Sequence, residues 1–121
     1  MNQCKQRLDG ISEEFKKCRK ALIAIGDETR QQIILALLES DCKGIRVGEI
    51  TKKTHLSRPA VSHHLQILKK AGIINMRREG TKNYYYMDSN ERQWKQITKL
   101  MNHIYEVVKE VAPIDTRHES I

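Results

Sequence analysis

Four polar side chains recur at helical spacing in the middle of the chain. They lie on the side of a predicted helix that faces away from its apolar residues, and they are Arg58, Ser62, His63 and Gln66. On that side they are free to meet the major groove of a DNA duplex. Arg58 can pair bidentately with guanine or contact a phosphate, and the sequence leaves both roles open.

A second basic group follows, at the junction of two short runs rich in β-branched and aromatic residues. The runs cover 73–78 and 82–87, and residues 79–81 join them, with Gly80 suited to a turn that needs a positive φ. This pattern predicts a β-hairpin whose basic tip reaches a minor groove or flanking phosphates. The basic residues that we expect to cluster at this tip are Arg77, Arg78 and Lys82.

Positive charge is concentrated on these two elements. Residues 43–83 contain ten Lys or Arg and two Glu, a formal balance of +8, whereas the whole chain carries +7. Such a distribution favours contact with nucleic-acid phosphates. A membrane-binding helix would instead carry its charges opposite an apolar stripe on the same helix.

The polar face requires a helix, a turn and a second helix within 46–71. Ser57 is placed to cap the second helix, and Pro59 is tolerated in the first turn because its nitrogen needs no hydrogen-bond partner there. The apolar stripe expected to be buried on this helix is Val61, Leu65 and Leu68. With the hairpin over 73–87, this order predicts a winged helix-turn-helix.

Both ends of the chain carry apolar residues at alternating spacings of three and four, which predicts amphipathic helices. The first begins near Leu8 and can be one helix or two; Gly26 ends it, and Asp27 is placed to cap the next helix. The last helix covers 89–112 and ends before Pro113. One small domain cannot easily cover both apolar seams, so we expect a homodimer. The predicted dimerisation residues are Leu8, Ile11, Phe15, Trp94, Ile97, Met101, Ile104 and Val108.

The length and composition predict a single, mainly α-helical domain with a small β-hairpin wing. It covers 1–112, and 113–121 is expected to be a flexible tail. The chain has no apolar run of about 18 residues and no signal-peptide core. We therefore expect a cytoplasmic protein without a membrane segment.

The chain shows no Ser/His/Asp set, glycine-rich phosphate loop or paired carboxylates, so we do not expect an enzyme. Its three cysteines are an odd number in a reducing compartment, which argues against structural disulfides. Cations flank Cys18, and their positive field favours a thiolate. Thiol sensing is therefore one hypothesis, and a small buried apolar residue is the other. The cysteines concerned are Cys4, Cys18 and Cys42.

Three segments carry a family resemblance: GDETRQQIILALL, LSRPAVSHHLQILKKAGII and RREGTKNYYYM. Together they resemble the ArsR/SmtB family of winged-helix repressors over residues 24–87. Glu28 departs from the pattern, because many members have proline there. The resemblance implies a homodimer formed by the first and last helices, with two recognition helices in successive major grooves of a near-palindromic operator. The DNA contacts that it implies are Arg58, Ser62, His63, Arg77, Arg78 and Lys82.

The family's metal sites are incomplete in this chain. The Cys-x-Cys pair that many members carry on the first helix of the motif falls on 47–51, which contains no cysteine. His103 and Glu106 match half of a second family site, but the other half falls on 89–92, without Asp or His in the required spacing. Zn²⁺ prefers four tetrahedral ligands. We therefore predict no metal site, and Zn²⁺ or a thiophilic metal stays an alternative cofactor.

These observations predict a sequence-specific regulator of transcription that binds double-stranded DNA. We expect a repressor of its own operon that an inducer releases. The alternatives are a constitutive regulator without an inducer, and a winged-helix protein-interaction module without a specific DNA target. Salt-dependent duplex binding separates the DNA-binding readings from the interaction module.

Overall fold

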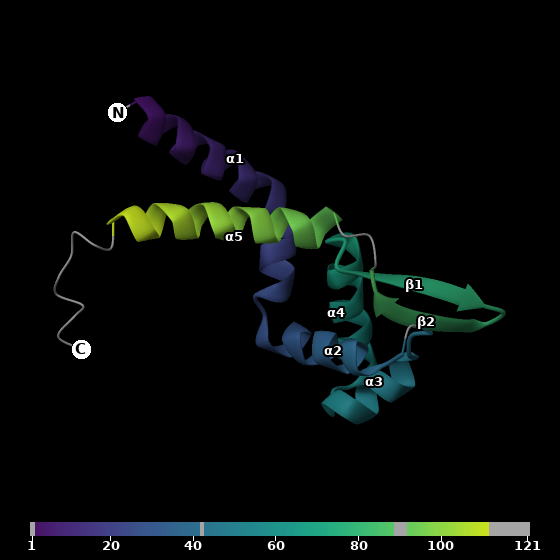
Figure 1. The fold of residues 1–121 in the computed structure, drawn as a ribbon. Helices are drawn as coiled ribbons and strands as arrows, with labels where there is room; N and C mark the ends of the chain where they lie inside the picture. Colours follow the sequence, from purple (N-terminus) through teal and green to yellow (C-terminus); the bar gives the residue numbers. More distant parts are fainter. Residues whose placement is uncertain (1, 42, 89–91, 112–121) are drawn as a thin grey trace, which may run out of the picture.

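Five helices and a two-stranded hairpin make up the computed structural model, which describes residues 2–41, 43–88 and 92–111. Figure 1 shows α1 and α5 extending to one side and the hairpin projecting to the other. The elements in chain order are α1 (Asn2–Ile25), α2 (Glu28–Glu39), α3 (Val47–Thr54), α4 (Arg58–Lys70), β1 (Ile74–Glu79), β2 (Lys82–Met87) and α5 (Arg92–Val111).

The N-terminal segment forms one helix, which resolves the choice between one helix and two. α1 ends at Ile25, and Asp27 caps α2 by accepting a hydrogen bond from the Arg30 N–H at 2.9 Å. This hydrogen bond lowers the pKa of the Asp27 carboxyl, because it stabilises the charged form. Both the end of the first helix and the cap of the second agree with the sequence prediction.

One arginine joins three helices. The Arg30 guanidinium donates to the carbonyl oxygens of Ala24 at 2.7 Å and Ile23 at 3.1 Å, both in the last turn of α1. Its Nη1 also lies 3.3 Å from Nδ1 of His64 on α4. These contacts satisfy carbonyls that a helix end leaves without partners, and they hold α1, α2 and α4 together.

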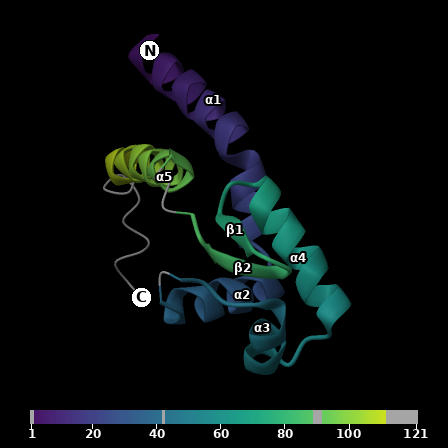
Figure 2. The ribbon, with the colours of Figure 1, turned by 90° about the vertical axis from the view of Figure 1, so that its right-hand side faces the viewer.

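The helix-turn-helix packs its apolar stripes into the core. Ser57 caps α4 by accepting from the Ala60 N–H at 3.3 Å, and His55 ends α3 in a left-handed conformation. Figure 2 shows α4 running along one side of the body, with α2 and α3 below the hairpin. The predicted stripe of α4 is fully buried, and the core around it includes Ile33, Leu37, Ile50, Val61, Leu65, Leu68, Ile73 and Ile74.

The wing is an antiparallel hairpin that a short bridge fastens to the core. Its strands cover 74–79 and 82–87, so β1 begins and ends one residue later than predicted. Ile45 and Tyr85 exchange two backbone hydrogen bonds, at 2.9 and 2.8 Å. Gly44 permits this approach, because its φ is +85° and a Cβ there would lie 2.6 Å from the Tyr85 oxygen.

The terminal helices pack against each other and leave part of their apolar seams exposed. Leu100 and Ile97 are buried in the core of their own chain, at 0% and 8% exposure. Ile97 therefore differs from the sequence prediction, which placed it at a dimer interface. We call the remainder the exposed apolar face, and it comprises Leu8 and Phe15 on α1 with Met101, Tyr105 and Val108 on α5.

The described part of α5 begins at Arg92, inside the predicted 89–112, and the predicted tail at 113–121 lies outside the described residues. Across 2–41, 43–88 and 92–111, no helix is both long enough and apolar enough to cross a bilayer.

Candidate nucleic-acid interface

The outward face of α4 carries the four predicted contact residues. Arg58, Ser62, His63 and Gln66 are all exposed, on the side opposite the buried Val61, Leu65 and Leu68. His64 is half-buried beside Arg30 and therefore does not belong to this exposed face. The exposed face therefore offers a continuous row of hydrogen-bonding groups of the kind that a recognition helix inserts into a major groove.

Arg58 differs from the other three in the position of its guanidinium, which lies against the start of α3. A Cβ built on Gly48 would be only 3.2 Å from Arg58 Nη2. Ser62, His63 and Gln66 follow one another along α4, whereas Arg58 reaches from its first residue toward a different helix. The Arg58 guanidinium therefore has a different environment from the side chains of Ser62, His63 and Gln66.

A polar cavity of about 500 Å³ lies where α3, α4 and the wing meet. Arg46 and Lys52 line it from the α3 side, Arg58 lines it from α4, and Asn83 lines it from β2. Arg46 and Asn83 were not among the predicted contacts. Arg46 precedes a helix and Asn83 precedes a run of tyrosines, and only the tertiary fold brings the two to one place.

Strand pairing sorts the basic wing residues onto opposite faces of the hairpin. Arg78 opposes Asn83, on the face that also carries the half-buried Tyr85, whereas Arg77 and Lys82 lie on the other face. The three basic residues lie near the tip of the wing but do not share one face, because successive residues of a strand point in opposite directions. Arg78 shares the side of the hairpin that lines the cavity.

The two wing arginines also differ in their partners. Arg77 Nε lies 3.0 Å from Glu79 Oε1, and its guanidinium carbon lies 5.0 Å from the centre of the Tyr84 ring. Arg78 Nε donates to the Gly80 carbonyl at 3.0 Å, without a carboxylate partner among the residues described. Arg77 therefore has a carboxylate partner within the wing, whereas the charge of Arg78 is not balanced by a described carboxylate.

We expect Arg78→Ala to weaken binding to any duplex by about ten-fold, because we expect Arg78 to contact a phosphate, and such a contact carries no sequence information. Arg77→Ala, the matched control, should weaken binding by less than about three-fold, since Arg77 is already paired within the wing. Fluorescence anisotropy with duplexes of two unrelated sequences measures both effects. A larger loss for Arg77→Ala would contradict this assignment of the wing faces.

Comparison with known proteins places these features in a family. A family model described as bacterial regulatory protein, arsR family, matches residues 27–76. An HTH-type transcriptional regulator of Methanocaldococcus jannaschii is 38% identical over 92 residues, which are 76% of this chain and 99% of that protein. This chain belongs to the ArsR family.

Two further relatives are also regulators of transcription. The transcriptional activator HlyU of Vibrio cholerae is 32% identical over 98 residues, covering 78% of this chain and 86% of HlyU. The solved structure of reduced HlyU matches with a TM-score of 0.60 and 29% identity, over 79% of this chain and 96% of that one. The transcriptional repressor SdpR of Bacillus subtilis is 36% identical over 67% of this chain and 86% of SdpR. The protein is therefore a DNA-binding transcriptional regulator of the ArsR family and not an enzyme.

His103 and Glu106 are the residues that match half of the family's second metal site, and both contact other side chains of this chain. His103 Nδ1 lies 2.7 and 3.0 Å from the two carboxylate oxygens of Glu14, and Glu106 pairs with Lys109 at 3.3 Å. Within the described parts of the chain, no group of three or more His, Cys, Asp or Glu is arranged to hold a metal ion. His103 thus serves here to join α5 to α1.

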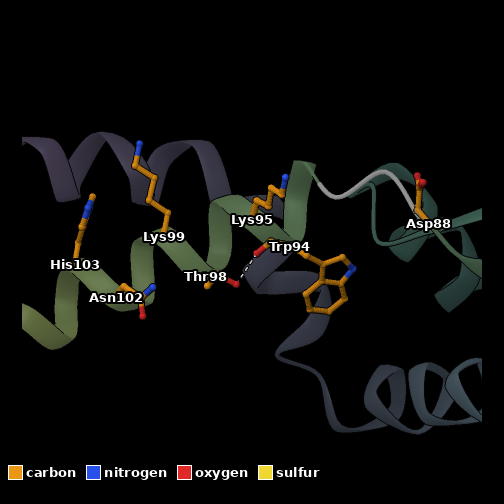
Figure 3. Close-up of a pocket in the computed structure, with 7 residues that line it drawn as sticks. All are labelled: Asp88, Trp94, Lys95, Thr98, Lys99, Asn102 and His103. Carbon is orange, nitrogen blue, oxygen red and sulfur yellow. Dashed lines mark hydrogen bonds between the residues drawn. The ribbon is translucent and has the colours of Figure 1, made fainter.

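A shallow hollow of about 590 Å³ runs along α5 beside His103. Figure 3 shows Lys95, Lys99 and His103 projecting from one side of the helix, and Trp94, Thr98 and Asn102 from the other. Because these groups diverge, they do not converge on a single ligand atom. We assign no effector to this hollow.

Cys18 is the one cysteine whose side chain the structure describes, and it is 1% exposed on the core side of α1. Burial raises the pKa of its thiol, and the nearby Glu14 carboxylate raises it further. The sequence hypothesis of a thiolate-favouring field at Cys18 is therefore wrong, because its flanking cations point to solvent while the sulfur lies in the core. Cys42 and the Cys4 side chain lie outside the description.

We expect iodoacetamide to alkylate Cys18 at least about ten-fold more slowly in the folded protein than in urea at pH 8. The raised pKa lowers the thiolate fraction, and burial blocks access to the sulfur. Peptide mass spectrometry after timed quenching measures the rate at this cysteine alone. Equal rates in both states would restore Cys18 as a reactive thiol.

Proposed function

We propose that this ArsR-family protein is a homodimeric repressor that binds a near-palindromic operator close to its own gene and is released by an inducer. The observation that carries the proposal is the exposed row on α4 beside a basic wing and a cationic cavity. A buried helix stripe holds that row rigidly, as base readout requires. Such a regulator acts in the cytoplasm, where the operator is.

The exposed apolar face supports the homodimer. Met101, Tyr105 and Val108 are 45%, 59% and 52% exposed on one side of α5. Residues at spacings of four and three share a helix side, so two copies related by a two-fold axis can bury these residues against each other. The same axis would present two α4 helices to successive major grooves of a palindrome.

We propose repression and not activation, because a dimer bound to an operator close to its own gene would exclude polymerase from that site. The two relatives differ in this respect, since SdpR is named as a repressor and HlyU as an activator. Transcription in vitro from the promoter of the chain's own gene decides between them. We expect less transcript with added protein, and an increase would assign activation instead.

The binding experiment measures fluorescence anisotropy with the duplex upstream of the gene and with a random duplex of equal length. We expect the upstream duplex to bind at least about a thousand-fold more tightly, and both affinities to fall steeply between 50 and about 200 mM salt. Equal affinities that salt does not change would favour the protein-interaction module. Repeating the titration with candidate inducers distinguishes an inducible regulator from a constitutive one.

A further inference from the structure

The cavity between α3, α4 and the wing is lined by cations from separate parts of the motif. Arg46 immediately precedes α3, Lys52 lies within α3, and Arg58 is the first residue of α4. All three are exposed, so an anion can reach them from solvent. Three positive charges around one cavity of about 500 Å³ repel each other unless an anion lies among them.

None of these three side chains has an ion pair or hydrogen bond to any residue in the described parts of the chain. Glu49 also lines the cavity, yet it lies beyond ion-pair distance of them. Some cations elsewhere do have partners, such as Arg7 with Glu110 at 2.6 Å. The cavity is therefore lined by three cations and one carboxylate, and none of the three cations is paired with that carboxylate.

Gly48 leaves the space that the Arg58 guanidinium occupies. A methyl group at Gly48 would approach Nη2 to 3.2 Å, closer than most real contacts of this kind. The backbone is helical here, so Gly48 is not required by its conformation. Its lack of a side chain instead keeps the floor of the cavity open to the guanidinium and to any group that the guanidinium binds.

Neutral donors complete the cavity on the wing side. Asn83 lines it from β2, and Thr81 lines it from the turn. A tetrahedral anion with several acceptor oxygens suits this mixture, because a guanidinium can donate two parallel hydrogen bonds to it while an amide and a hydroxyl donate others. A base edge offers fewer acceptors and no charge.

We propose that this cavity binds one backbone phosphate of the DNA duplex in each protomer, with Arg58 as its principal ligand. Arg58 then fixes the position of α4 in the groove instead of reading a base, and Ser62, His63 and Gln66 carry the sequence readout. The inference rests on the proposed duplex binding by the α4 face. It chooses between the two contacts that the sequence left open for Arg58, a guanine base and a phosphate.

The first test compares Arg58→Ala with Arg19→Ala, which removes an exposed arginine from α1. Anisotropy is measured at several salt concentrations with the upstream duplex and the random duplex. We expect Arg58→Ala to weaken both by about ten-fold or more, and to lower the slope of log affinity against log salt by about 0.9 per protomer. Arg19→Ala should change neither quantity.

The second test places a methyl group beside the Arg58 guanidinium without removing charge. We expect Gly48→Ala to leave the melting temperature unchanged or raised, since alanine favours a helix over glycine, while weakening both duplexes by about three-fold or more. Gly10→Ala is the control, because a Cβ at this α1 glycine meets nothing within 4 Å. It should leave DNA affinity unchanged.

The third test locates the phosphate by replacing single phosphates of the upstream duplex with neutral methylphosphonates. One position in each half-site should weaken the wild-type protein but not Arg58→Ala. Loss confined to the upstream duplex would make Arg58 a base reader and overturn the proposal, as would an unchanged salt slope. Failure of the wild-type protein to bind either duplex would overturn the proposed function as well.

Discussion

Met101→Glu is expected to convert the proposed homodimer into a monomer and to lower operator affinity by about a hundred-fold or more. Met101 belongs to the exposed apolar face, is 45% exposed, and lies on the same side of α5 as Tyr105 and Val108. A two-fold axis would bring both new carboxylates into one apolar interface, where an unpaired charge is strongly unfavourable. Each monomer would then hold a single half-site and lose the gain in effective concentration that links the two.

Sedimentation velocity measures the oligomeric state, and circular dichroism verifies that the monomer remains folded. Lys99→Glu is the control, because it adds the same side chain to an exposed position on the opposite side of α5. It should leave the sedimentation coefficient unchanged. A dimeric Met101→Glu protein would refute the interface. Ile104 is a poorer choice for this test, since it is half-buried against its own core.

Gln66→Ala is expected to reduce sequence discrimination by about ten-fold to a hundred-fold. Gln66 is exposed on α4, and a glutamine amide can pair bidentately with adenine in the major groove. Removing it should weaken binding to the upstream duplex and change binding to a random duplex by less than about two-fold. Competition anisotropy with the two duplexes measures the ratio directly.

Lys69→Ala provides the matched comparison from the last turn of the same helix. Lys69 is exposed, and an ammonium group there contributes charge without base selectivity. We expect it to weaken both duplexes by the same small factor and to leave their ratio unchanged. If Gln66→Ala weakens both duplexes equally, as Lys69→Ala should, then another residue of α4 reads the bases.

Local rules predicted the helices and their ends well. Asp27 and Ser57 were both predicted as caps, and both accept the expected backbone hydrogen bond. Spacing alone identified Val61, Leu65 and Leu68 as the buried side of α4, and therefore also its exposed side. These features depend on residues within a turn or two of each other, which is the range over which a sequence pattern acts.

Features that depend on contacts between elements were predicted less well. The cations beside Cys18 in sequence suggested a thiolate, but helical geometry points those side chains to solvent while the sulfur is buried. The apolar seam of α5 did not reveal that Ile97 belongs to the core of its own chain. The place of Arg58 beside Gly48 joins residues from two helices, and nothing in either local pattern indicates it.

The contacts of Arg30 have a consequence for how such a regulator can change. The Arg30 guanidinium on α2 binds the end of α1 and also lies against His64 of α4. A displacement of α1 can therefore reach α4 through this side chain as well as through the direct packing of the two helices. Residues that bind an effector can therefore change on α1 and α5 while the exposed residues of α4 stay the same.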